Sequence, residues 1–372
     1  MHVLVTADAL SGPWTYTREL VTGLVTRGVR VTLVSLGEIP LPEQTAWMDH
    51  LHGLDYRPTA FHLEWMQEAE EDLPESSAFL IGLVRELRPD VLHLGQFCFG
   101  NLPVNAPRVV VPQGDLITWR EAVQDRKAGG SIPTKWYRDT VGRGIAGADA
   151  VAAPSYWMLG RISACYAPAR RAEVISPGRN PIFFNPYISK EDSVLAVGRL
   201  VDAGKQVSLL TKHEHPVPVR IVGAEQTVAV PRIPIRADVK VAVAETSVAI
   251  CGPQTEAQLR ALYSRASIFA ATARYDPLGM STLEAALSRC AIVANDIPSF
   301  REMWGDTVLY FRTNDAASLA ASIRLLNDDR SMRRSYGELA YTRARERFTS
   351  KRMIEEYLQL YRGLAAVRSA AA

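Results

Sequence analysis

Short apolar runs alternate with helical patterns along the first half of the chain. Strands are predicted where apolar residues run together, at 2–6, 29–36, 90–94, 108–112, 148–154 and 172–177. Helices are predicted between them, at 15–28, in a segment that ends near Leu87, and at about 155–166. Short buried strands that alternate with helices are typical of a parallel, doubly wound α/β sheet.

The same pattern restarts after "PGRNPIFFNP" (177–186), which is rich in proline and asparagine and is interpreted as a linker. Strands follow at 193–198, 217–223, 246–252, 267–272, 291–295 and 307–311. Helices are predicted at 256–266, where Thr255 and Gln258 form a capping box, and at about 315–327, 330–347 and 350–366. Residues 224–243 show no helix period, so irregular connections are expected there. The chain therefore predicts two α/β domains of similar size, whose ligands bind beyond the carboxyl ends of the strands.

Composition and charge narrow the class of protein. The 372 residues carry a net charge of only +2, which argues against a nucleic-acid partner. The four cysteines are far apart, so neither a zinc site nor a disulfide framework is expected, and a reducing cytoplasm fits them. The N-terminal stretch lacks the basic region of a signal peptide, and no apolar run has the length of a membrane span.

The segment "VGRLVDAGKQ" (197–206) brings Arg199 and Lys205 to a glycine-bearing turn after a strand. It is not a P-loop, because five residues separate Gly198 from Gly204 and Gln206 stands where Ser or Thr would hold magnesium. The sequence also argues against a dinucleotide-binding turn, because the first strand is followed by a single glycine. The two cations could bind a diphosphate, and the alternative is that they are solvated loop residues.

The segment 273–302 places two carboxylates around a helix that should begin near Met280. The free N–H groups of such a helix attract phosphate. Glu284 is expected to point toward the cleft, because Leu283 and Leu287 take the core face, although an acid there could simply complement the helix dipole. Cations suit a diphosphate and the acceptor-only carboxylates of Asp276 and Glu284 suit hydroxyl groups, so the combination predicts a nucleotide sugar.

These residues resemble a known family. About residues 2–366 are similar to the GT-B glycosyltransferases of the family 4 type, which retain anomeric configuration. The family pattern E-x7-E, with "FG" inside it and "EAMA.G.PVVA" after it, compares with Asp276, Leu278-Gly279, Glu284 and "EAALSRCAIVAND" here. Asp276 is a shorter acid than the usual Glu, and Leu278 replaces the usual Phe.

Two further segments carry the resemblance. The family motif "GRL…K" appears as Gly198, Arg199, Leu200 and Lys205, and "VISPGRNPIFFNP" resembles the family's "VIPNGVDxxxFxP". The first half matches less well. Gly12 stands alone where the family has two glycines, and Gln113 and Asp115 follow the strand after which the family often has a His.

The resemblance implies a fold and a reaction. Two Rossmann-like domains would face each other across a cleft, residues 1–178 with a returning helix at 350–372, and residues 179–349. A sugar would move from a UDP- or GDP-sugar to an acceptor with retention, without a metal ion or other cofactor. Arg199 and Lys205 would neutralise the diphosphate, Glu284 would accept from the ribose hydroxyls, and Asp276 would accept from those of the sugar.

The remaining site residues follow from the same resemblance. Gly12 would let a loop approach the phosphates, and the backbone N–H groups at the helix start would meet sugar and phosphate. Gln113 or Asp115 would meet the donor sugar, with Asp115 as a turn-capping residue the alternative. Donor-binding residues are therefore predicted at Gly12, Gln113, Asp115, Gly198, Gly223, Gly252, Pro253, Gly279, Met280, Ser281 and Thr282.

The acceptor is expected to be a glycan, a lipid-linked sugar or a small molecule. Residues 118–139 mix Trp119, Trp136 and Tyr137 with basic and acidic side chains. Such a mixture could contact an acceptor or the inner face of a membrane, and a solvated loop and helix is the alternative. A nucleotide-sugar epimerase of the same fold and a non-catalytic sugar-nucleotide-binding homologue stay open, although an epimerase would require a His in the cleft.

Overall fold

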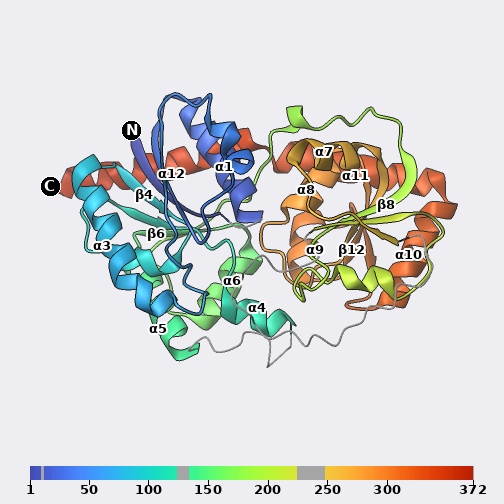
Figure 1. Ribbon diagram of the computed structural model, residues 1–372, viewed down its shortest axis with the longest axis horizontal. Coiled ribbons are helices and arrows are strands. Elements are labelled where there is room, and N and C mark those ends of the chain that lie inside the picture. Colours follow the sequence, from blue (N-terminus) through green and yellow to red (C-terminus); the bar gives the residue numbers. More distant parts are fainter. Residues whose placement is uncertain (10–11, 124–133, 224–247, 372) are drawn as a thin grey trace. The chain divides into compact units, whose positions relative to one another are not determined.

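The computed structural model describes residues 1–9, 12–123, 134–223 and 248–371. The chain forms two compact units, and the C-terminal helix belongs to the first of them (Figure 1). Unit 1 comprises Met1–Thr118, Ser131–Gly178 and Ser350–Ala372, and unit 2 comprises Trp119–Gly130 and Arg179–Thr349.

Unit 1 is built on a parallel sheet with the strand order β3-β2-β1-β4-β5-β6-β7 in the described residues. The strands are β1 (His2–Asp8), β2 (Arg30–Leu36), β3 (Leu54–Pro58), β4 (Val91–Leu94), β5 (Arg108–Val110), β6 (Ala150–Ala153) and β7 (Ala172–Val174). Val3, Leu4 and Val5 of the central strand β1 are all buried, because neighbours cover both faces of the sheet.

The helices of unit 1 lie on both sides of its sheet (Figure 1). They are α1 (Gly12–Val25), α2 (Pro42–Thr45), α3 (Ala69–Leu87), α4 (Leu116–Val123), α5 (Thr134–Gly147), α6 (Tyr156–Cys165) and α12 (Ser350–Ala371), with single 3₁₀ turns η1 (Ala46–Met48) and η2 (Phe97–Asn101). Helix α4 begins in unit 1, and its residues from Trp119 onward belong to unit 2.

The C-terminal helix α12 packs against α1 and β4, as the resemblance implied. Gly23 makes the close helix crossing, since a Cβ on it would lie 2.5 Å from Cγ1 of Ile354. Buried polar contacts fix the register: the Tyr16 hydroxyl donates to that of Tyr357 at 2.7 Å, and His93 Nδ1 lies 2.6 Å from the Tyr361 hydroxyl. The buried face of α12 is therefore part of the core of unit 1.

This buried contact predicts how stability depends on pH. Burial lowers the pKa of His93 to about 3, below its ordinary value of 6.5. Below pH 6.5 the unfolded chain takes up a proton that the folded chain does not, so stability falls by about 1.4 kcal/mol per pH unit from this group. We expect the melting temperature of His93→Gln to fall less between pH 7.5 and pH 5 than that of the native chain.

The measurement is thermal unfolding of both proteins at the two pH values. The other titrating groups contribute equally to the pH dependence of both proteins. The difference between the two proteins therefore gives the contribution of His93. His52→Gln, at an exposed position, is the matched control and should follow the native chain. An equal loss in His93→Gln and the native chain would show that burial of His93 does not govern the acid sensitivity.

Unit 2 is built on a second parallel sheet, with the strand order β10-β9-β8-β11-β12-β13 in the described residues. Its strands are β8 (Glu191–Val197), β9 (Val219–Val222), β10 (Val248–Ile250), β11 (Ala266–Ala271), β12 (Ala291–Asn295) and β13 (Leu309–Phe311). Its helices are α7 (Glu256–Arg265), α8 (Met280–Leu287), α9 (Pro298–Trp304), α10 (Ala316–Asp328) and α11 (Arg330–Arg347), with 3₁₀ turns η3 (Pro181–Phe183) and η4 (Val207–Thr211).

Two hydrophobic clusters cover the two faces of this sheet. Along β8, Val194 and Ala196 belong to one cluster and Leu195 belongs to the other. This alternation is what a strand buried on both faces produces. The core holds the strands in register, so that their carboxyl ends form one edge of unit 2.

Most predicted elements are confirmed within a few residues, including the capping box of Thr255 and Gln258 at the start of α7. The sequence missed β3, which is a half-exposed edge strand with few apolar residues. It also gave no bounds for the helices α2, α4, α5 and α9. The irregular connection predicted at 224–243 lies outside the described residues.

Candidate functional site

The carboxyl ends of four neighbouring strands gather the predicted residues of unit 2. Gly198 follows β8, Gly223 follows β9, Gly252 comes two residues after β10, and β11 leads into the segment that holds Asp276. Parallel strands end at the same edge, which is where ligands bind in sheets of this kind. Unit 2 therefore brings these residues together from distant parts of the chain.

Gly223 allows a close approach of two backbone segments at this edge. A Cβ on Gly223 would lie 2.4 Å from the carbonyl oxygen of Gly198. The Gly223 N–H donates to the Gly252 carbonyl at 3.1 Å, and Gly252 has a φ of +58°, which favours glycine. Pro253, also predicted to bind the donor, follows at an exposed position. The edge is thus formed by backbone, with no room for a side chain at Gly223.

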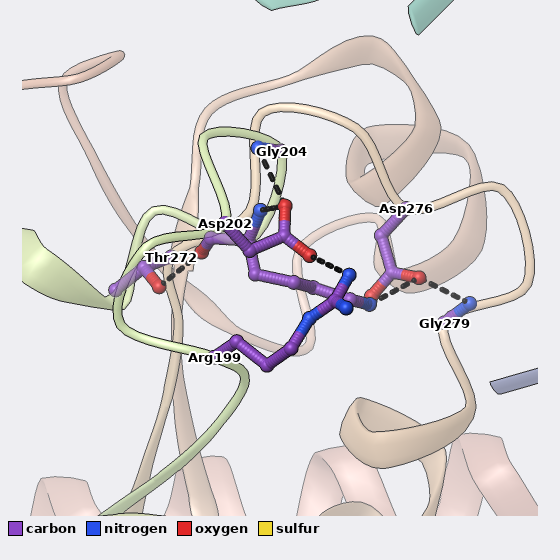
Figure 2. A network of polar contacts seen from close by, with 7 residues as sticks. Arg199, Asp202, Gly204, Thr272, Asp276 and Gly279 are labelled. Atoms are coloured by element: carbon purple, nitrogen blue, oxygen red, sulfur yellow. Dashed lines mark hydrogen bonds and ion pairs between the residues drawn. The ribbon is translucent and has the colours of Figure 1, made fainter. Parts of the chain in front are cut away.

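Asp202 shapes the loop between Gly198 and Lys205. Its Oδ1 accepts from the N–H groups of Gly204 at 2.9 Å and Lys205 at 3.1 Å (Figure 2). Its Oδ2 pairs with Nη2 of Arg199 at 3.3 Å. The sequence analysis did not single out Asp202, although it lies inside the predicted motif. Arg199 is held in place by this carboxylate rather than solvated without a partner.

Lys205 and Asp276 form the second ion pair of the site. Lys205 Nζ lies 3.0 Å from Asp276 Oδ1, which also accepts from the Gly279 N–H at 3.2 Å (Figure 2). The Thr272 hydroxyl donates to the Lys205 carbonyl at 2.8 Å and fixes the backbone behind it. Asp276 is buried, whereas about a third of the Lys205 side chain is exposed. The predicted sugar-binding carboxylate is therefore also the residue that orients Lys205.

Helix α8 begins at Met280, as predicted, with Gly279 as its N-cap at φ +60°. The first N–H groups of a helix have no partner within it and carry partial positive charge. In α8 these belong to Met280, Ser281 and Thr282, next to the Lys205–Asp276 pair. The Gly279 N–H, predicted to meet the donor, donates instead to Asp276. The helix start thus adds positive potential beside the two cations.

Glu284 does not have the exposure that its helix position suggested. It is only 7% exposed, and its Oε1 lies 3.0 Å from Nη2 of Arg179. Burial, together with the nearby Glu284 carboxylate, raises the pKa of Tyr263 well above its ordinary value. Glu284 is therefore more buried than expected, and its contact with a donor stays a prediction. Its carboxylate is kept in a buried position by a cation.

Arg179 is a buried residue at the start of the main segment of unit 2. It lies in the segment interpreted as a linker, yet it is only 1% exposed. Its backbone N–H donates to the Phe348 carbonyl at 3.0 Å, and it forms a bridge with Thr349. Sequence reasoning missed Arg179, and the signal that could have found it was an arginine where the resembling motif has valine.

The predicted residues of unit 1 lie at the carboxyl edge of its own sheet or at a helix start. Gly12 is the first residue of α1, and space is open around its Cα. Asp115 is buried, accepts from the hydroxyls of Tyr137 at 2.9 Å and Tyr166 at 2.6 Å, and accepts from the Thr118 N–H in the first turn of α4. These contacts favour the capping alternative for Asp115.

Two other polar groups lie near this edge. Gln113 is 8% exposed, and its Oε1 has no hydrogen-bond partner in the described residues. Burial raises the pKa of Glu64 to about 7, although its carboxylate accepts from the N–H groups of Phe97 and Cys98. Tyr137 is buried, so it is not part of the mixed surface predicted at 118–139, of which residues 124–133 lie outside the described range.

Comparison with protein families decides the identity of the chain. The model of the "Glycosyl transferase 4-like domain" matches residues 11–178, and that of "Glycosyl transferases group 1" matches residues 178–343. The chain belongs to the group 1 glycosyltransferases. The second match contains the site of unit 2, from Gly198 to Glu284.

This group 1 glycosyltransferase also resembles individual proteins. It is 30% identical over 117 residues to the α-maltose-1-phosphate synthase of Mycolicibacterium smegmatis, a match that covers 29% of this chain and 30% of that relative. The fold is similar to that of sucrose-phosphate synthase from Thermosynechococcus elongatus, with a TM-score of 0.79, 18% identity, and coverage of 99% of this chain and 100% of that one.

A second solved structure shares this fold. HepE from Anabaena in complex with UDP-glucose gives a TM-score of 0.75 at 13% identity, with coverage of 98% of this chain and 100% of HepE. These likenesses establish a GT-B fold for the glycosyltransferase. Within the described residues, no helix is long and apolar enough to cross a membrane, and no three His, Cys, Asp or Glu side chains gather as a metal site.

Proposed function

We propose that this chain transfers a sugar from a UDP- or GDP-linked donor to an acceptor, with retention of anomeric configuration and without a metal ion. Arg199, Lys205 and the start of α8 lie together at one edge of a parallel sheet, beside Asp276. This arrangement is the main support for the proposal. The UDP-glucose bound in the HepE structure supports a nucleotide-sugar donor here.

The chemistry follows from where charge develops. Breaking the anomeric bond leaves an oxocarbenium-like sugar and adds negative charge to the departing diphosphate. Arg199 and Lys205 stabilise that charge, and the start of α8 adds its partial positive charge. Asp202 and Asp276 hold the two cations in place beforehand, so little reorganisation is needed during the reaction.

The carboxylates select the donor. Asp276 accepts hydrogen bonds from hydroxyls of the sugar while it orients Lys205, and Glu284 accepts from hydroxyls of the ribose. Asp276 is one methylene shorter than the acid of the family pattern, so we propose that this position influences which sugar is accepted. Gly198, Gly223 and Gly252 let the phosphates approach the backbone closely.

Donor binding is the first expected result. Thermal-shift measurements with UDP-, GDP- and ADP-sugars should show stabilisation by one base, and the same donor should release its diphosphate slowly in water. Glu284→Gln should weaken that binding by about 10-fold or more, the usual cost of a lost hydrogen bond to a charged group. Absence of binding by every donor would contradict the proposal. Binding without turnover would favour a non-catalytic homologue, and interconversion of donor sugars would favour an epimerase.

Metal removal and product stereochemistry form the second test. We expect diphosphate release to continue at an unchanged rate in excess EDTA, because protein cations neutralise the leaving group. Proton NMR of the product should show the anomeric configuration of the donor. A rate that collapses in EDTA and returns with Mg²⁺ would contradict metal independence, and an inverted product would contradict retention.

A further inference from the structure

Arg179 joins Glu284 to a row of alternating charges within unit 2. Its guanidinium pairs with Glu284 Oε1 at 3.0 Å and with Glu256 Oε1 on α7 at 3.2 Å. Glu256 also pairs with Arg260, one turn further along α7. The side-chain exposures are 9% for Glu284, 1% for Arg179 and 34% for Glu256, so Arg179 is the most buried of the three and Glu256 the most exposed.

The surroundings of Arg179 make this arrangement rigid. The guanidinium lies 5.2 Å from the centre of the Phe184 ring, and Phe184 and the fully buried Tyr263 belong to one hydrophobic cluster. The backbone of Arg179 is tied to Phe348 and Thr349, at the end of α11. A planar guanidinium with fixed donors holds a carboxylate in one orientation more firmly than an ammonium would.

Packing alone gives a weak reason for an arginine at this position. Taking an ion pair out of water is costly, and well-packed apolar residues often stabilise a fold equally well. The cation matters for what it does to Glu284, because a buried carboxylate without a cation tends to take up a proton.

We propose that Arg179 is a positioning residue that keeps the Glu284 carboxylate ionised and oriented to accept hydrogen bonds from the ribose of the donor. This inference rests on the proposed function, in which Glu284 binds the ribose hydroxyls. Arg179 itself acts through Glu284, and the same Nη2 atom also contacts Glu256. The predicted consequence is that preference for a ribonucleotide depends on Arg179.

The experiment compares a nucleoside diphosphate with its deoxy forms. Calorimetric titration with UDP, GDP and ADP identifies the nucleotide that binds most tightly, and that nucleotide is then compared with its 2′-deoxy and 3′-deoxy forms. The native chain should prefer the ribonucleotide by about 10-fold or more over at least one deoxy form. Arg179→Leu should reduce that preference to about 3-fold or less, as should Glu284→Gln.

Two further variants separate positioning from folding. Glu256→Gln breaks the pair of Arg179 with Glu256 and should keep the native preference, because the pair with Glu284 stays. Arg179→Lys keeps the charge without the planar fork and should lower the preference at least about 3-fold. It also serves as the deciding variant if Arg179→Leu does not fold, with thermal melting as the check on folding.

The outcomes distinguish the two proposals. If the native chain binds none of the three diphosphates, the proposed function fails and this inference fails with it. If the native chain binds one of them but folded Arg179 variants keep its full preference over the deoxy forms, only the role of Arg179 is overturned. A loss of preference in Glu256→Gln equal to that in Arg179→Leu would also overturn it, since general loosening of the region would then explain both.

Discussion

Lys205→Ala should lower the rate of diphosphate release from the donor by about 10²–10³-fold, the usual effect of removing one preorganised group that stabilises developing charge. Lys205 lies at the end of a loop fixed by Asp202 and Thr272, and its ammonium is 3.0 Å from Asp276. The loss should appear mainly in kcat, because the diphosphate gains charge as the anomeric bond breaks.

Removing Lys205 also leaves the buried Asp276 without its cation, and a second variant separates this effect from the loss of charge. The double variant Lys205→Ala/Asp276→Asn has no carboxylate at position 276 to repel the diphosphate. If such repulsion causes part of the fall in rate of Lys205→Ala, the double variant should release diphosphate faster than Lys205→Ala does. Lys212→Ala, an exposed lysine of unit 2 after η4, is the matched control and should retain the native rate. Native kcat in Lys205→Ala would refute the role of this residue in leaving-group stabilisation.

Gly223→Ala should impair both stability and activity. The added Cβ would lie 2.4 Å from the Gly198 carbonyl oxygen, 2.7 Å from its carbon and 3.0 Å from the Arg199 nitrogen. These are backbone atoms and cannot swing aside as a flexible side chain could. Overpacking of this kind costs about 1–3 kcal/mol, and displacement of a binding group by about 1 Å can cost about 10²-fold in rate.

Thermal unfolding and donor turnover of Gly223→Ala measure the two effects. Gly160→Ala is the matched control, because Gly160 lies within α6 and a Cβ added to it would meet no atom within 4 Å. That change should leave activity intact and stability unchanged or slightly raised, since alanine favours helix. If Gly223→Ala has the melting temperature and the donor turnover rate of the native chain, the close backbone approach at this edge is not needed for stability or activity.

The fold was predictable from the sequence where burial is uniform. β1 and β8 are central strands covered on both faces, so their apolar runs are unbroken and easily recognised. β3 is an edge strand with half-exposed residues, and its sequence "LDYRP" carries little hydrophobic pattern. α9 is only seven residues long and begins at Pro298. Elements of this kind depend on their neighbours more than on their own residues.

The candidate site divides in a similar way. The start of α8 was predictable, because a proline, a glycine and small polar residues mark the beginning of a helix in a sequence. Gly223 and Gly252 were named only because of the family resemblance. The partners of the charged residues were not predictable. Asp202 was overlooked within its motif, and Arg179 pairs with Glu256, which lies 77 residues away.

Local rules are enough to specify the order of the buried strands along the chain, the residues at their carboxyl ends and the types of charge gathered there. Apolar runs form buried strands, and only glycine lacks a Cβ, so both can be recognised in the amino-acid sequence. The pairing of Lys205 with Asp276 and the burial of Glu284 against Arg179 arise only in the folded chain. An ion pair is set by the distance between two charges and by their exposure to water, and both depend on how remote segments pack together.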